Sequence, residues 1–208
     1  GILKDNIDMK IPEVESTIRI AGTWEAPIFQ VENNEPISSD LIFADEDFFK
    51  LFNYTFIEGS PKTALKEPMT IVITKRLSDK LFGKEEAVGK VIKLNNSKSL
   101  TVNGVIEEPK ANTCLSFSAV TSITTRKIVL YEPDEYTKWG ERNFQTFILL
   151  KKGTYPDEIG RKILSLFPEN DQESLKDTGL TPLRSIYFSD FTLFGNNYLI
   201  SGDKKKVL

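Results

Sequence analysis

The segment from Met69 to Gly83 restricts the fold more than any other part of the sequence. Ile71, Val72 and Ile73 form a continuous apolar run, which is typical of a strand buried on both faces. Thr74 then stands where a helix N-cap is expected, and Gly83 stands where a C-cap glycine is expected, nine residues later. A buried strand that runs directly into a capped helix indicates a layered domain built from both strands and helices.

Short strands and short helices alternate along the rest of the chain. Residues 91–94 and 100–106 flank a polar loop and predict a hairpin. Further strands are expected over 14–20, 36–43, 117–123 and 144–150, helices over 2–9, 48–52, 75–82 and 155–167, a surface segment near 131–139 and an extended piece over 180–183. This pattern predicts an α+β fold in which a mixed β-sheet carries helices packed on one face.

The length of 208 residues suits a single domain over 1–208. Residues 107–143 are less regular, and Pro109, Asn112 and Pro133 interrupt any helix or strand there. This range is therefore a candidate for a small inserted lobe within the domain. No stretch approaches the ~20 apolar residues of a membrane span. Because the chain begins without Met, we expect it to be a piece of a longer protein.

The composition excludes several classes of function. The chain has no histidine, which removes His-based catalytic triads, His metal sites and His pH switches. It has one cysteine, Cys114, which forms neither an internal disulfide nor a zinc site alone. The net charge of -3, with both signs mixed along the chain, does not resemble the basic surface of a nucleic-acid-binding protein.

The remaining candidates for chemistry each have a simpler structural interpretation. Glu107 and Glu108 are adjacent, and neighbours on an extended chain point to opposite faces. The acids Asp45–Asp47 suit a helix N-terminus without any metal. Cys114 has no histidine to activate it and is expected to be partly buried. No phosphate-binding glycine motif is present either. From these observations together, we expect no catalytic residue, metal or cofactor.

Three aromatic residues in the irregular segment are candidates for contact with a partner protein. Tyr131, Tyr136 and Trp139 lie close together in the sequence, and aromatic side chains are enriched at interface hot spots. The alternative is that they pack the segment onto its own domain.

Several motifs together resemble the MacB/FtsX-type permeases of ABC transporters. The motifs are Phe48-Phe49-Lys50-Leu51-Phe52 with Phe56-Ile57-Glu58-Gly59, Ile71-Val72-Ile73-Thr74 with Leu81-Phe82-Gly83, Val88-Gly89-Lys90 with Leu100 to Val105, and Leu180-Thr181-Pro182-Leu183 with Ile186-Tyr187-Phe188. Their order and spacing cover about residues 10–190, and they are mainly residues that determine the fold.

The resemblance implies the periplasmic core domain that lies between the first and second transmembrane helices of such a permease. It implies a location on the periplasmic side of a bacterial cytoplasmic membrane. It also implies a second permease subunit, a cytoplasmic ABC ATPase and a periplasmic or outer-membrane protein as partners. Lys204–Lys206 before Val207 and Leu208 resemble the approach to a membrane span, although an ordinary solvated tail is an equal alternative.

The implied function is non-catalytic coupling of ATP-driven motion to substrates or partner proteins outside the membrane. A competing hypothesis is an extracytoplasmic domain that binds or senses a peptide or a lipid, based on the aromatic content. A hydrolase is a third hypothesis, and only the abundance of Ser, Asp and Glu supports it.

Overall fold

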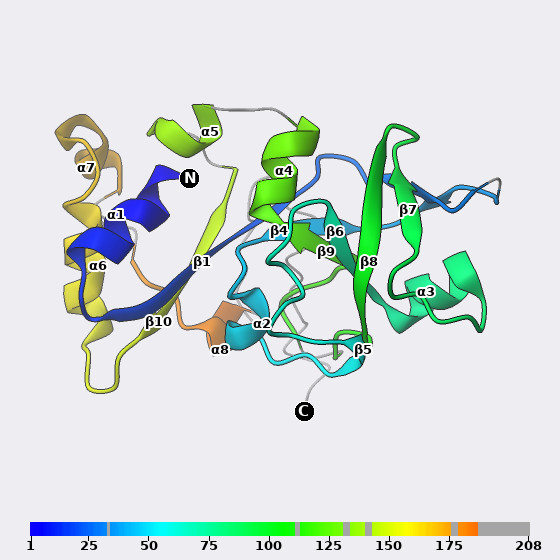
Figure 1. Cartoon of the computed structure of the whole chain (residues 1–208). Coiled ribbons are helices and arrows are strands. Elements are labelled where there is room, and N and C mark those ends of the chain that lie inside the picture. Colours follow the sequence, from blue (N-terminus) through cyan, green and yellow to red (C-terminus); the bar gives the residue numbers. More distant parts are fainter. Residues whose placement is uncertain (33, 111–112, 131–133, 140–142, 176–178, 187–208) are drawn as a thin grey trace, which may run out of the picture.

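The computed structural model describes residues 1–32, 34–110, 113–130, 134–139, 143–175 and 179–186 (Figure 1). Within these residues, ten strands form one mixed sheet in the order β10-β1-β4-β9-β6-β8-β7-β2-β3, with β5 paired to β8. The strands are β1 (Val14–Gly22), β2 (Ile28–Gln30), β3 (Ile37–Ser38), β4 (Leu41–Ala44), β5 (Phe56–Gly59), β6 (Thr70–Thr74), β7 (Val91–Leu94), β8 (Lys98–Ile106), β9 (Ala119–Ser122) and β10 (Gln145–Leu150). The β4–β9 and β6–β8 pairs are parallel, and the other pairs are antiparallel.

The longer helices lie over one face of this sheet, which confirms the predicted fold class. The helices are α1 (Ile2–Lys10), α2 (Phe48–Leu51), α3 (Lys75–Phe82), α4 (Ile123–Leu130), α5 (Asp134–Thr137), α6 (Pro156–Leu164), α7 (Glu169–Leu175) and α8 (Leu183–Ile186). α3 and α4 cover a core that includes Phe43, Ile71 and Ile73, and α1 and α6 form a smaller core against β1 and β10. The short α2 and α8 pack on the opposite face.

The strand β6 is buried on both faces, as its apolar run predicts. Ile71 and Ile73 point into the core under α3, while Val72 points into the core on the other face. The side chain of Thr74 accepts a hydrogen bond from the Leu77 amide at 3.4 Å, and Gly83 ends α3 with φ +67°. These caps confirm the helix that the sequence predicts.

Several of the predicted elements differ from the structure, and the helix expected over 155–167 ends at Leu164. The strand expected over 117–123 ends at Ser122, because α4 begins at the next residue. Ser122 Oγ accepts a hydrogen bond from the Thr125 amide at 3.0 Å and so caps the start of this helix. The strand expected over 36–43 is interrupted at residues 39 and 40, between β3 and β4. The piece expected to be extended at 180–183 leads into the helical turn α8.

β9 and α4 both lie within the range 107–143, and β9 pairs between β4 and β6 in the middle of the sheet. The assignment of 1–208 to one domain and of 107–143 to a small lobe stays a prediction. Among the described helices, none combines the length and the apolar character that crossing a bilayer requires. The tail with Lys204–Lys206, Val207 and Leu208 lies outside the described residues.

Candidate partner-contact segment and the buried arginines beneath it

Tyr136 lies on α5 and packs against its own domain with part of its surface exposed. Its ring is 5.3 Å from the ring of Phe144, and Lys127 Nζ lies 4.4 Å from the centre of the tyrosine ring. Arg126 Nη1 donates a hydrogen bond of 3.5 Å to the Tyr136 hydroxyl. Tyr136 therefore joins α5 to α4 and to the residue just before β10.

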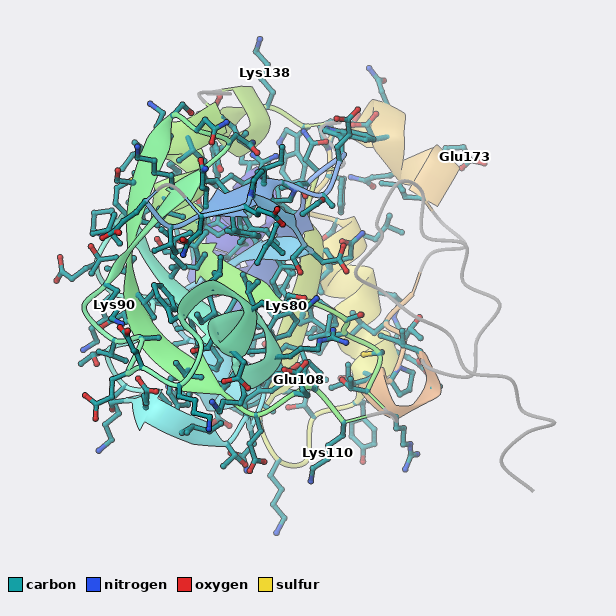
Figure 2. All side chains as sticks on the ribbon, turned by 90° about the vertical axis from the view of Figure 1, so that its right-hand side faces the viewer. Lys80, Lys90, Glu108, Lys110, Lys138 and Glu173 are labelled. Carbon is teal, nitrogen blue, oxygen red and sulfur yellow. The ribbon has the colours of Figure 1, made fainter. Side chains whose placement is uncertain are left out.

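Trp139 packs against a different part of the domain from Tyr136. Its ring lies 4.8 Å from the ring of Phe167, which follows the end of α6, and the indole is half-buried. The neighbouring Lys138 is exposed and points away from the ribbon at the top of Figure 2. The structure therefore separates the contacts of Trp139 from those of Tyr136, and Tyr131 lies outside the described residues.

Beneath this segment, Arg19 and Asp45 form a buried ion pair. Arg19 Nε and Nη2 donate to the two carboxylate oxygens of Asp45 at 3.0 and 2.8 Å, and the Arg19 amide donates to the same carboxylate at 2.7 Å. The side chains are only 11% and 13% exposed. Although burial opposes the charge of Arg19, hydrogen bonding to Asp45 leaves the arginine pKa raised above its ordinary value.

This pair corrects one expectation from the sequence, because Asp45 was expected to act with Glu46 and Asp47 at a helix N-terminus. In the structure the second face of β1 is covered too, and Asp47, not Asp45, precedes α2. The two partners are 26 residues apart, so no spacing rule in the sequence indicates the contact.

A second buried arginine, Arg126 on α4, lies close by. Its guanidinium group is 5.7 Å from the centre of the Phe43 ring and 5.4 Å from that of Phe144. Arg19 lies 5.8 Å from the same Phe144 ring. The Phe144 ring is therefore in contact with one arginine from β1 and one from α4. Such contacts are favourable because the face of an aromatic ring attracts a cation.

Arg19 also contacts the first residue of the chain. Its Nη1 donates to the Gly1 carbonyl at 3.4 Å. Next to this contact is a mainly polar cavity of about 310 Å³, bordered by Asp5, Arg19, Asp45 and Thr17. The hydroxyl of Thr17 is buried and has no hydrogen-bond partner among the described residues.

Two other residues that the sequence offered as candidates for chemistry, Glu108 and Cys114, contribute instead to a helix cap and to the buried core. Glu108 Oε1 accepts a hydrogen bond from the Arg76 amide at 2.8 Å, so it caps the first turn of α3; Glu108 is labelled in Figure 2. Cys114 is 6% exposed, and burial raises the pKa of its thiol. No cluster of three or more Cys, Asp or Glu side chains suited to a metal ion occurs in the part of the chain that the structure describes.

The family of the chain is shown by its sequence. A model of the MacB-like periplasmic core domain matches residues 3–166, which is more than half of the chain. The chain belongs to this family. The family comprises the extracytoplasmic domains of ABC transporter permeases, and this confirms the resemblance seen in the sequence motifs. A search of curated proteins gives no match.

Three solved structures have the same fold. A domain assigned to a permease protein from Porphyromonas gingivalis is 23% identical, with a TM-score of 0.68 over 83% of this chain and 79% of that one. The periplasmic region of MacB from Actinobacillus actinomycetemcomitans is 12% identical, with a TM-score of 0.60 over 85% and 82%. The extracellular domain of the noncanonic ABC-type transporter YknZ from Gram-positive bacteria is 14% identical, with a TM-score of 0.61 over 80% and 82%.

Proposed function

We propose that this chain is the non-catalytic coupling domain of an ABC transporter permease subunit. In this proposal it lies on the periplasmic side of a bacterial cytoplasmic membrane and passes ATP-driven motion to substrates or partner proteins. The family match over residues 3–166 is the observation that carries the proposal. A second permease subunit, a cytoplasmic ABC ATPase and a periplasmic or outer-membrane protein are its proposed partners.

The attachment of α1 supports a role in coupling. Ile7 and Ile11 are buried against Ile159 of α6, and Arg19 holds the Gly1 carbonyl. A displacement of the start of the chain would therefore be transmitted to β1 and β10 through packed side chains rather than lost in a loose connection. The same arginine lies against Phe144, which contacts Tyr136.

This chain of contacts also supports a proposal for the partner surface. Tyr136 and Trp139, with Tyr131, are proposed to form the contact for the protein outside the membrane. The two described members are half-buried, so each has one side anchored in the domain and another side available.

The test uses the full-length permease in vesicles together with its ATPase. Ile7→Ala should loosen α1, so ATP hydrolysis should continue while transport falls several-fold. Met9→Ala is the matched control, because Met9 lies on the same helix and is 74% exposed. Unchanged transport in a folded Ile7→Ala protein would contradict the coupling role.

A further inference from the structure

The strand β10 lies at one end of the sheet, and among the described strands it pairs only with β1. Its sequence, Gln145 to Leu150, contains neither charge nor proline. In an antiparallel pair, alternate backbone N–H and C=O groups of an edge strand point away from the neighbouring strand. β10 also lacks the lysines and prolines that commonly protect such an edge from pairing with another chain.

A segment of the same chain passes around this edge without filling the space beside it. Leu180 packs with the core under α6, whereas Ile186 on α8 packs with the core on the opposite face. Figure 1 shows this part of the chain running from the side of α7 to α8 beside α2. Between residues 179–186 and β10 lies a groove of about 570 Å³.

The described side chains that line the groove are mainly apolar and carry no charge. They include Leu51, Phe147, Leu149, Leu180, Leu183 and Ile186. Leu149 is 40% exposed and Leu183 is 44% exposed, so the apolar surface is open to a ligand. A charged ligand would lose its hydration here without gaining a partner.

The strand edge distinguishes between two uncharged ligands. An acyl chain would cover the outward backbone groups of β10 and leave them without hydrogen bonds, which is costly. An extended peptide would satisfy the same groups by adding a strand, while its alternate side chains enter the apolar groove. We propose that this groove binds an uncharged, extended peptide segment of a partner protein by β-strand addition to β10.

The test measures hydrogen exchange of the β10 amides of the 208-residue chain with and without an end-capped peptide, acetyl-Thr-Val-Thr-Phe-Thr-Val-amide. We expect the peptide to slow exchange at least about tenfold at those amides of residues 146–150 that point away from β1, because the other amides are already bonded to β1. A peptide with Asp in place of Phe should not do so. Leu149→Lys and, separately, Thr181→Lys should weaken binding about tenfold or more, and Ile128→Lys, on the exposed side of α4, should not.

Three results would overturn the proposal. The first is strong protection, without peptide, of the β10 amides that point away from β1, which would mean that another part of the chain or a second copy already covers the edge. The second is unchanged peptide binding by both folded lysine variants. The third is binding of sodium decanoate in the groove without binding of peptide, which would indicate an acyl-chain site. All three readouts use the domain without an ATPase, so they are independent of the coupling role.

Discussion

At the scale of single residues, a few side chains have roles that depend on contacts distant in the sequence. Asp45 stands in an acidic run with Glu46 and Asp47, yet it alone turns inward to a buried arginine. The removal of one partner from a buried ion pair leaves the other charge without compensation, which costs much more than the loss of a surface pair.

We therefore expect Asp45→Ala to lower the free energy of unfolding by about 3–5 kcal/mol, because Arg19 stays buried without its carboxylate. Urea denaturation followed by circular dichroism measures this loss. Asp47→Ala is the control, because Asp47 is half-exposed and its Oδ2 lies 3.8 Å from Lys50 Nζ in a surface ion pair. This substitution should change the free energy of unfolding by no more than about 0.5 kcal/mol. Equal effects of the two substitutions would argue against a buried pair.

A side chain has very little room at Gly59. It has φ +83°, and a Cβ atom there would lie 2.4 Å from the Asn103 carbonyl oxygen. Gly153 has a similar φ of +88° but open space around it. Gly153→Ala should cost about 1–2 kcal/mol from backbone strain alone, and Gly59→Ala should cost at least about 2 kcal/mol more. Thermal and urea denaturation of both variants compare the two costs.

Cys114 should be unreactive in the folded protein. Burial raises the pKa of its thiol, so the reactive thiolate is scarce at neutral pH, and the sulfur is poorly accessible. Labelling with a thiol reagent at pH 7.5 should be slow in buffer and should become fast in concentrated urea. Rapid labelling under native conditions would show that Cys114 is accessible.

At the scale of elements, α3 combines local and distant signals. Thr74 and Gly83 are readable in the sequence as its two caps. Glu108 adds a third contact to its first turn from a loop 32 residues away. The acid at a helix N-terminus is favourable because it satisfies an otherwise unpaired amide and opposes the helix dipole.

Thr74→Ala should lower the free energy of unfolding by about 0.5–2 kcal/mol, since the Leu77 amide loses its side-chain acceptor within a buried region. Exchange of the amides at the start of α3 should become faster. Thr124→Ala is the control because Thr124 is exposed on α4, and it should be neutral or slightly stabilising. A Thr74 variant with wild-type stability would show that the long 3.4 Å bond contributes little.

At the scale of the whole molecule, one sheet connects three cores. Strands such as β4 and β6 place alternate residues in the cores on the two faces. β1 and β10 join the third core, under α1 and α6, to the same sheet. Because the cores share strands, we expect them to unfold together.

Ile7→Ala tests this cooperativity at the edge of the molecule. It should cost about 2–5 kcal/mol, as large-to-small substitutions in a core do. The unfolding curves from tryptophan fluorescence and from circular dichroism should still coincide as one transition. Met9→Ala should leave the midpoint nearly unchanged. A separate early transition in Ile7→Ala would show that the α1 core unfolds independently.

The sequence by itself determined the class of fold, the buried strand β6, the caps of α3 and the β7–β8 hairpin, because local periodicity and capping residues specify each of them. It also placed Tyr136 and Trp139 in an irregular segment, and their role as partner contacts stays a prediction. Only the tertiary structure decided that Arg19 is buried against Asp45, that Arg126 lies beside Phe144, and that a groove runs along β10. These features depend on which strands become neighbours, and that choice comes from packing between residues far apart in the chain.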